Sequence, residues 1–459
     1  MSILRVGNGA GFWGDSPSAP GQLLRTGNLD YLTLEYLAEL TLSILAHQKS
    51  KNRESGFVTD VPAAAVELAS LRREGSSTRL VTNGGGMNPV GCARKVANEL
   101  LSRDLPDLKI GVVVGDDFAG RLDDLVAGGE PLANLDTGQE LATIRDRIAS
   151  ANVYLGAKGI VEALADEADI VLTGRIADAS LVTGPCIHEF GWRFDQLDRI
   201  ANATVAGHLI ECGAQVTGGF FSGWTPEIRL GTVGYPIAEI NELGESIITK
   251  PDSSGGVVNE ATCAEQLIYE IGDPTRYLTP DVIADFSHVR FKSAGPNRVQ
   301  ATGGRANGIP EKLKASIAYY DGFMISSMIV VAGPGCVEKA EFAGKAIFEK
   351  LANDGIQFRE TRVEILGAGD SMPGARSDQT DPWEVVLRVS ARSDRKEHTD
   401  RLGRELAPLV TSGPPGITGY TGSRPRSTPV LSFWPTLVSR EHFETETVVQ
   451  PASQWAVAR

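Results

Sequence analysis

The sequence predicts an α/β protein in which the N-terminal half forms a mostly parallel, doubly wound sheet and a second domain is α+β. In the first half of the chain, a short β-branched run, a polar Gly-rich turn and a helical stretch recur in that order. The 459 residues exceed the roughly 250–300 residues that one hydrophobic core usually serves, so two domains are expected. Beyond about residue 220, Gly and Pro separate shorter segments, which is typical of hairpins.

The strands of the first half are recognised by the turns that follow them. They are residues 3–6 before GNGAGFWGD, 79–81 before TNGGGMNP, 109–114 before GDD, and 169–172 before TGRIADAS. Helical spacing of apolar or small side chains occurs between them at residues 34–48, 61–73 and 89–101. This alternation favours parallel strands joined by right-handed crossovers, and ligand sites of such sheets lie at the carboxyl ends of the strands.

The predicted organisation has three parts. Residues 1–224 form a Rossmann-like α/β domain, residues 225–445 form the α+β domain, and residues 446–459 form a polar tail. In the second domain, residues 338–353 and 394–406 are expected to be helical, and residues 383–390 to be a strand.

Composition excludes several functional classes. A formal net charge of −14 argues against an electrostatic nucleic-acid surface. The chain begins without a signal-peptide pattern and contains no run of about 18 apolar residues, so neither export nor a membrane span is expected. Five cysteines without a CxxC pair fit reduced thiols, and we expect a cytoplasmic protein.

The first Gly-rich turn has glycines at 7, 9, 11 and 14, close to a dinucleotide fingerprint but with different spacing. Trp13 and Pro17 stand where the helix should begin, and no acidic residue ends a second strand about 20 residues on. NAD(P) is therefore not expected, and no other cofactor is certain. Asp15 is a candidate acid, base or metal ligand, the alternative being a turn in which Asp15 caps a helix.

The second turn contains Gly84, Gly85 and Gly86, whose backbone N–H groups are expected to form a nest for a carboxylate or phosphate. Asn83 and Asn88 are candidates for orienting a substrate carbonyl, although amides cannot transfer the proton. The alternative is a tight turn followed by Asn88 as a helix N-cap.

The turn TGRIADAS carries the sharpest group of polar residues, Arg175, Asp178 and Ser180. Arg175 is expected to bind a carboxylate or phosphate in bidentate fashion, with Ser180 as a further binding residue. Asp178 either holds that arginine or acts as a base. An internal Arg175–Asp178 pair that serves only the loop is the alternative.

Three further positions carry titratable candidates. His208 and Glu211 stand at i and i+3 of a predicted helix and could bind a divalent metal, with other ligands from Asp15, Asp178 or His188. The alternative is a hydrogen bond on one helix face. His188 is a candidate general base or a structural histidine, and Lys250 is a candidate anion-binding residue or a surface-turn residue.

Some catalytic motifs are missing from the sequence. It contains no Walker P-loop, HExxH, GxSxG elbow or protein-kinase set. Mononucleotide hydrolysis and classical esterase chemistry therefore have little support.

Several segments, in order, resemble the acyclic terpene utilisation family (AtuA) over roughly residues 3–445. They are GNGAGFWGDSP, LDYLTLEYLAELTLSIL, VTNGGGMNP, TGRIADASLVTGP, HLIECGAQVTGG, PIAEI, EQLIYEIGDPTRYLTPDV and KLKASIAYYDGF. The resemblance implies a cytosolic protein of bacterial catabolism of citronellol-like acyclic terpenes and related branched acyl-CoA compounds. It implies no established reaction. Some members of this family carry a further small C-terminal domain, which a separately encoded subunit could replace here.

The favoured hypothesis is a lyase or hydratase that acts on a branched hydroxyacyl-CoA or hydroxycarboxylate, in a homo-oligomer. Arg175 and the 84–86 turn would bind the acid end, and Asp15, Asp178 or His188 would move the proton. One alternative is an acyl-CoA hydrolase or transferase with Cys92, Cys212 or Ser180 as nucleophile. Another is a noncatalytic acyl-CoA-binding subunit of a catabolic complex.

Overall fold

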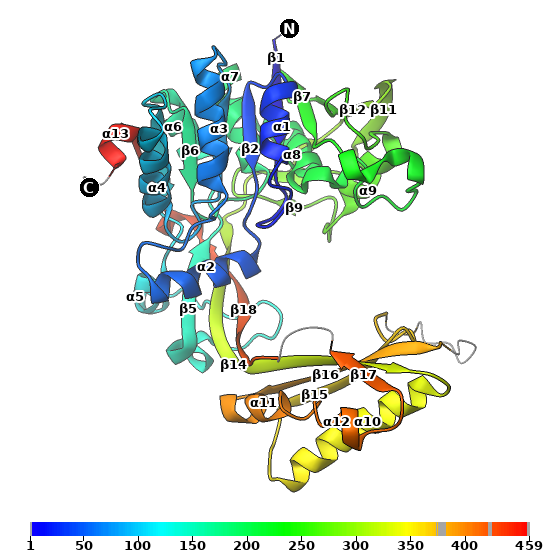
Figure 1. The fold of residues 1–459 in the computed structure, drawn as a ribbon. Coiled ribbons are helices and arrows are strands. Elements are labelled where there is room, and N and C mark those ends of the chain that lie inside the picture. The colour runs from blue at the N-terminus through cyan, green and yellow to red at the C-terminus, as the bar shows by residue number, and fades with distance from the viewer. Residues whose placement is uncertain (1, 373, 375–381, 421–424, 457–459) are drawn as a thin grey trace. The chain divides into compact units, whose positions relative to one another are not determined.

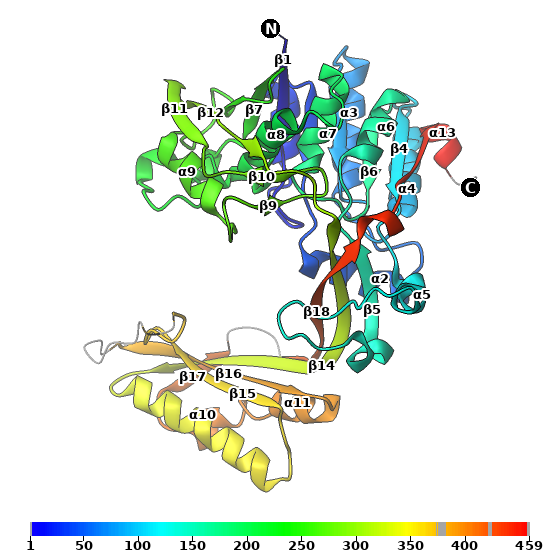
Figure 2. The ribbon, with the colours of Figure 1, turned by 180° about the vertical axis from the view of Figure 1, so that it is seen from behind.

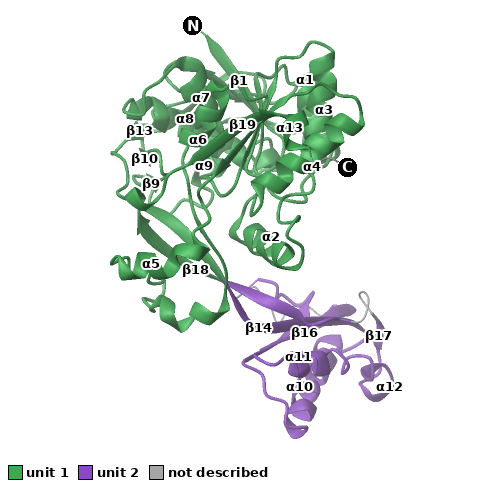
Figure 3. Cartoon of the chain, turned by 90° about the vertical axis from the view of Figure 1, so that its left-hand side faces the viewer, with its two compact units in different colours: residues 1–318, 433–459 green, residues 319–432 purple. Residues whose placement is uncertain are grey.

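The computed structural model describes residues 2–372, 374, 382–420 and 425–456. The chain divides into two compact units, which Figure 3 distinguishes by colour. The first contains Met1–Ala318 and Phe433–Arg459, and the second contains Tyr319–Ser432. The boundary thus lies about a hundred residues beyond the expected one at 224, because the intervening residues extend the sheet of the first unit.

Within the described residues, the first unit is built on a ten-stranded sheet of order β11-β12-β8-β7-β1-β2-β3-β6-β4-β19. Its five central strands are parallel, so their carboxyl ends share one edge. They are β1 (Ile3–Asn8), β2 (Tyr31–Leu34), β3 (Arg79–Thr82), β6 (Ile170–Thr173) and β4 (Lys109–Val114).

Antiparallel strands extend both sides of this parallel centre, so the sheet is mixed rather than mostly parallel. On one side are β7 (Ile237–Asn241), β8 (Ser246–Thr249), β12 (Arg298–Thr302) and β11 (Arg290–Gly295). On the other side, β19 (Glu446–Pro451) pairs with β4. The predicted polar tail therefore begins with an edge strand of the main sheet, followed by α13 (Ala452–Trp455).

Helices cover both faces of the central strands, because successive strand side chains point to opposite faces. Leu80 and Ile170 belong to one core cluster, whereas their neighbours Val81 and Val171 belong to the other. The first face is covered by α1 (Ala19–Thr26), α3 (Val61–Arg73) and α4 (Pro89–Ser102), seen in front in Figure 1. The second is covered by α6 (Lys158–Ala165), α7 (Ser180–Phe190) and α8 (Leu197–Glu211), seen more directly in Figure 2.

The predicted helix at residues 34–48 is wrong at its start. Tyr31–Leu34 forms β2, the second parallel strand, and helix α2 begins only at Glu39 and ends at Lys51. All four side chains of β2 are buried, so leucines that looked like one helical face partly belong to a strand covered on both sides. Because β2 ends at Leu34, a further strand-end turn starts at Glu35.

Smaller elements complete the first unit. The helices are α5 (Leu122–Ala127) and α9 (Glu260–Ile268). A three-stranded sheet contains β13 (Arg305–Ala306), β10 (Ile283–Asp285) and β9 (Tyr277–Leu278), and β5 (Ile148–Val153) pairs with β14. Short 3₁₀ turns lie at Ala119–Arg121, Leu141–Thr143, Arg145–Arg147, Gly213–Gln215, Pro226–Ile228, Leu230–Thr232 and Arg440–His442.

The second unit has an antiparallel sheet covered by helices. Its strands are β15 (Glu360–Leu366), β16 (Glu384–Ser393), β17 (Ile417–Tyr420) and the later part of β14 (Lys312–Ala332), a strand that starts in the first unit and also pairs with β18 (Thr428–Ser439). Its helices are α10 (Cys336–Asn353), α11 (Lys396–Leu402) and α12 (Leu409–Ser412). Apolar residues of α10, such as Ile347, pack against Leu387 of β16 in one core cluster.

In the part of the chain that the structure describes, no helix combines the length and apolar character needed to cross a bilayer.

Candidate functional site

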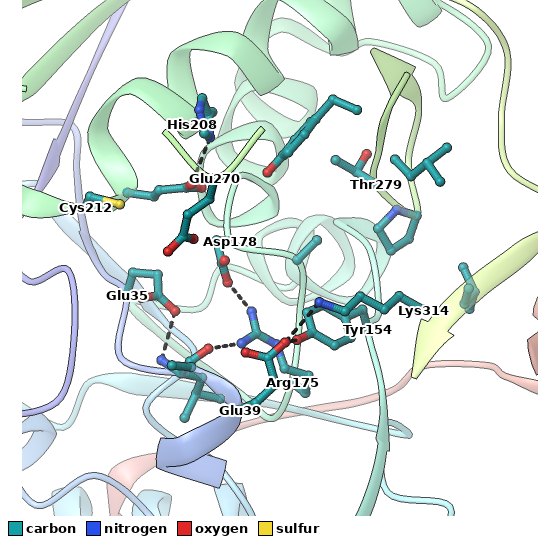
Figure 4. A pocket seen from close by; sticks show the side chains of 18 of the residues that line it. Glu35, Glu39, Tyr154, Arg175, Asp178, His208, Cys212, Glu270, Thr279 and Lys314 are labelled. Carbon is teal, nitrogen blue, oxygen red and sulfur yellow. Dashed lines mark hydrogen bonds and ion pairs between the residues drawn. The ribbon is translucent and has the colours of Figure 1, made fainter. Parts of the chain in front are cut away.

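A cavity of about 560 Å³ lies at the carboxyl edge of the parallel strands, and every residue that lines it belongs to the first unit. The turn after β1 contributes Gly11 and Phe12, and the turn after β6 contributes Arg175 and Asp178. The turn after β2 contributes Glu35, Leu37, Ala38 and Glu39. The remaining wall comes from Tyr154, the end of α8, and residues of the 269–280 and 310–314 segments (Figure 4).

Arg175 is a clamp between two of these turns rather than a free cation. Only 1% of its side chain is exposed, and its guanidinium donates to Leu37 O, Ile176 O and Asp178 Oδ1. Cζ of Arg175 lies over the ring of Tyr154, 4.5 Å from its centroid. Most of its N–H groups are thus used by the protein, so the predicted bidentate grip on a substrate carboxylate does not match this geometry.

Asp178 and Glu35 are two carboxyl groups with different surroundings. Asp178 pairs with Arg175 and has 35% of its side chain exposed. Glu35 is buried, and its Oε1 accepts hydrogen bonds from Leu37 N at 2.8 Å and Asn83 Nδ2 at 2.7 Å. Burial, followed by repulsion from Asp178, raises the pKa of Glu35 well above its ordinary value. The cavity therefore has one carboxyl group that tends to keep its proton beside a carboxylate that pairs with arginine.

A second charged group lies on the wall formed by Tyr154 and Lys314, next to Arg175 (Figure 4). Glu39 Oε1 accepts hydrogen bonds from Tyr154 Oη at 2.5 Å and Lys314 Nζ at 2.9 Å. Burial alone would raise the pKa of Glu39, but the charge of Lys314 and these hydrogen bonds lower it to about 2. Lys314 Nζ also lies 4.7 Å from the ring centroid of Tyr154, and Lys312 lines the cavity nearby. This wall can attract an anionic group of a ligand.

Replacing Lys314 with methionine is expected to raise the pKa of Glu39 from about 2 to a value no longer depressed below the ordinary glutamate range, because its main stabilising charge is removed. A ¹³C NMR titration of the glutamate carboxyl groups would measure this. The matched control is Lys158→Met, which removes an exposed lysine paired with Glu162 on α6. If Glu39 titrates identically in the wild type and in Lys314→Met, the assignment of Lys314 as its main partner is incorrect.

His208 and Glu211 form a buried pair at the end of α8. Nδ1 of His208 lies 2.9 Å from Glu211 Oε1, and Nε2 lies 3.2 Å from Leu267 O. The aromatic rings of Tyr277 and Phe286 lie 5.3 and 5.5 Å from the imidazole. Burial alone would lower the pKa of His208, but the adjacent Glu211 raises it, and burial raises the pKa of Glu211.

The same geometry bears on the predicted divalent-metal site. Both ring nitrogens of His208 already face protein oxygen atoms, so binding a metal would require one of these contacts to break. Among the described residues there is no group of three or more His, Cys, Asp and Glu side chains arranged to hold a metal ion. The alternative interpretation, a hydrogen bond on one helix face, is the arrangement observed.

The Gly-rich turn after β3 is placed behind the cavity wall rather than in it. The N–H groups of Gly84, Gly86 and Asn88 donate to Thr82 Oγ1, Asn83 O and Gly85 O. A Cβ atom on Gly85 would lie 2.6 Å from Thr173 O, so glycine lets this turn approach β6. Two of the three proposed nest groups, the N–H groups of Gly84 and Gly86, therefore donate to the protein itself.

The two asparagines of this turn have separate roles. Asn83 donates to Glu35 and accepts from Tyr36 N at 2.8 Å, so it supports the acidic wall from behind. Asn88 is the N-cap of α4, accepting from Gly91 N at 3.0 Å, as in the alternative considered from the sequence.

Four other predicted site residues lie outside the cavity lining, namely Asp15, Ser180, Lys250 and His188. Asp15 accepts hydrogen bonds from Gly11 N and Tyr235 Oη and faces a separate pocket. Ser180 donates to Asp281 Oδ2 at 2.7 Å. Lys250 is buried and donates to Ser254 O at 2.9 Å. The structure does not bring these three side chains together with Asp178.

His188 lies away from the cavity because α7 runs from the carboxyl edge of the parallel strands toward their amino edge. Its Nε2 lies 3.4 Å from Nη1 of Arg79, the first residue of β3, and thus near the amino edge of the parallel strands. The helix begins at Ser180, next to the carboxyl edge, and eight residues at 1.5 Å each place His188 about 12 Å along its axis.

Comparison with known proteins agrees with the sequence resemblance. The family model described as acyclic terpene utilisation family protein AtuA matches residues 4–449, nearly the whole chain. No curated protein and no solved structure matches.

Proposed function

The chain belongs to the acyclic terpene utilisation family AtuA, and from this premise we propose that it is an acid–base lyase, specifically a hydratase acting on a branched hydroxyacyl-CoA or hydroxycarboxylate. The observation that carries the proposal is the pair of carboxyl groups of Glu35 and Asp178 in one cavity. Glu35 is a buried carboxyl group with a raised pKa, and Asp178 is a second carboxyl group that is paired with arginine, so the two can serve as acid and base in one reaction.

In this proposal, Asp178 removes the proton from the carbon next to the substrate carbonyl. Glu35, whose pKa is raised by burial, gives its proton to the departing hydroxyl, so that water leaves and a carbon–carbon double bond forms. In the direction of hydration, the same groups exchange roles. Arg175 fixes Asp178 in position, because it is held by backbone carbonyls of two turns.

In this proposal, the anionic end of the substrate binds at the part of the cavity lined by Lys312 and Lys314. Arg175 and the 84–86 turn use most of their donors within the protein, whereas Lys312 and Lys314 line the cavity and Lys314 donates to one protein group, Glu39. In a protein of net charge −14, such local positive charge would be needed to hold a carboxylate or a CoA phosphate.

Replacing Glu35 with glutamine is expected to change how stability depends on pH. Because the folded-state pKa of Glu35 is raised, the wild type loses unfolding free energy as pH rises above the ordinary glutamate pKa and through the raised pKa. The variant lacks this loss. Urea unfolding at a series of pH values would measure both curves, with Glu54→Gln, an exposed position in the turn that follows α2, as the control. Parallel curves for the wild type and Glu35→Gln would contradict a raised pKa.

The reaction itself is tested with purified full-length protein and a panel of branched hydroxyacyl-CoAs, analysed by mass spectrometry. Loss or gain of the mass of one water supports the proposal. Loss of a fragment of two or more carbons would indicate carbon–carbon lysis instead. No mass change with any member of the panel, while the compounds still bind, would favour the noncatalytic binding subunit.

A thiol-dependent hydrolase or transferase has one supporting observation, since Cys212 lines the cavity. However, burial and then the nearby Glu211 raise the pKa of Cys212, which reduces its thiolate fraction. Cys92 is fully buried on α4, and Ser180 donates its hydroxyl hydrogen to Asp281. Cys212→Ser should therefore retain turnover if the hydratase proposal is correct.

A further inference from the structure

One oxygen of the cavity wall has no protein partner. Glu211 Oε2 is buried and makes no hydrogen bond with any described residue, and Glu211 is one of the residues that line the cavity. Its other oxygen, Oε1, faces His208. Buried carboxyl oxygens are nearly always hydrogen-bonded, because leaving one unpaired costs free energy, so this atom calls for a donor.

The hydrogen bonds of His208 determine what kind of group can satisfy Oε2. Since Leu267 O can only accept, the hydrogen of Nε2 is directed to it, and the remaining proton lies between Nδ1 and Glu211 Oε1. Whichever of these two atoms carries that proton, Oε2 carries none. A further proton would leave a buried imidazolium without its counter-charge. Oε2 is therefore an acceptor, and the ligand must supply the donor.

The surroundings favour a neutral donor over an ammonium group. The His208–Glu211 pair has no net charge in either protonation arrangement, and the rings of Tyr277 and Phe286 flank the imidazole. A desolvated ammonium would lose hydration without gaining a net counter-charge from this pair, whereas a hydroxyl needs only one acceptor. The carboxylates of Asp178 and Glu270 share this cavity but cannot act as donors when ionised.

We propose that Glu211 Oε2 accepts a hydrogen bond from a hydroxyl group of the substrate, and that His208 is the positioning residue that aims it. This inference rests on the proposed function, to which it adds the group that selects hydroxylated over deoxy substrates. Glu211 lies at the C-terminus of α8, where the contact of His208 with Leu267 O fixes the direction of the carboxyl group.

The test is equilibrium binding rather than turnover. Isothermal titration calorimetry of the full-length chain would compare 3-hydroxy-3-methylbutanoyl-CoA with 3-methylbutanoyl-CoA, which lacks only the hydroxyl. The wild type is expected to bind the hydroxylated compound about tenfold more tightly or better, because the deoxy compound leaves Oε2 unpaired. Mass spectrometry of the same samples would detect any product, and its absence would count only against the proposed function.

Two substitutions separate the role in binding from a structural one. Glu211→Gln should retain the preference, because its amide NH₂ can face Nδ1 and leave the amide oxygen in the place of Oε2. Glu211→Met should bind the two compounds equally, even if its melting temperature is also lower. Glu99→Gln, far along the chain on the surface of α4, is the control and should retain the wild-type ratio.

Equal affinity of the wild type for the two compounds, or no measurable binding of either, would overturn the inference. An unchanged ratio in Glu211→Met would do the same. Because the wild-type comparison is decisive on its own, the test does not depend on the methionine variant folding.

Discussion

Replacing Asp178 with asparagine is expected to reduce turnover by about 10² or more, because an amide cannot accept the proton that the proposed reaction removes. The fold should be retained, since the amide oxygen can still accept the hydrogen bond that Arg175 donates. The measurement is the initial rate with the hydroxyacyl-CoA identified by mass spectrometry, together with the melting temperature.

The matched control for this substitution is Asp124→Asn, which changes the same functional group at an exposed position of α5. It should leave the rate unchanged. If Asp178→Asn and the wild type turn over at the same rate, Asp178 is not the base, and its pairing with Arg175 serves only to hold the loop, which was the alternative considered from the sequence.

The location of the candidate cavity at the strand ends was largely predictable, because strand-end turns are visible as local patterns. TGRIADAS follows a buried apolar strand, and two of its three candidate residues, Arg175 and Asp178, do line the cavity. The pattern could not show which acceptors bind the N–H groups of Arg175. The partners of Arg175 include Leu37 O, which comes from a turn 138 residues earlier in the chain.

Glu35 and Glu39 were missed because the strand before them was interpreted as part of a helix. Leucines at 34, 37 and 45 fit a helical period, yet Leu34 ends β2 and Leu37 lies in the turn. The residues Tyr31, Leu32 and Thr33 were the available signal, since aromatic and β-branched side chains favour strands. Recognising β2 would have placed Glu35 in a strand-end turn like that of Asp178.

The glycines after β3 show the opposite case. Their local pattern suggested an anion-binding nest, whereas in the structure the turn forms internal hydrogen bonds and packs against β6. The backbone N–H groups of such a turn bind an anion only when they are left without protein acceptors. Here Gly86 N donates to Asn83 O within the turn itself, and Gly85 lies against Thr173 O at the end of β6, a contact that depends on tertiary packing. Sequence spacing alone does not contain that information.

Replacing Arg175 with methionine is expected to lower the unfolding free energy by about 2–6 kcal/mol, because two buried carbonyl oxygens lose their donor at a cost of about 1–3 kcal/mol each. The carbonyl oxygens of Leu37 and Ile176 would lose their charged donor, and Asp178 would lose its counter-charge. Urea unfolding followed by tryptophan fluorescence suits this measurement, because all six tryptophans except Trp383 lie in the first unit.

Arg193→Met is the control that separates this effect from the loss of any arginine. The Arg193–Asp195 pair is largely exposed, with 75% and 68% of the two side chains accessible, so its removal should cost no more than about 1 kcal/mol. Arg175→Lys is expected to lie between the two variants, because lysine keeps the charge but cannot reproduce the planar set of donors that reaches two turns at once. If Arg175→Met is no less stable than Arg193→Met, the two turns hold their positions without the clamp, and Asp178 would need another reason for its orientation toward the cavity.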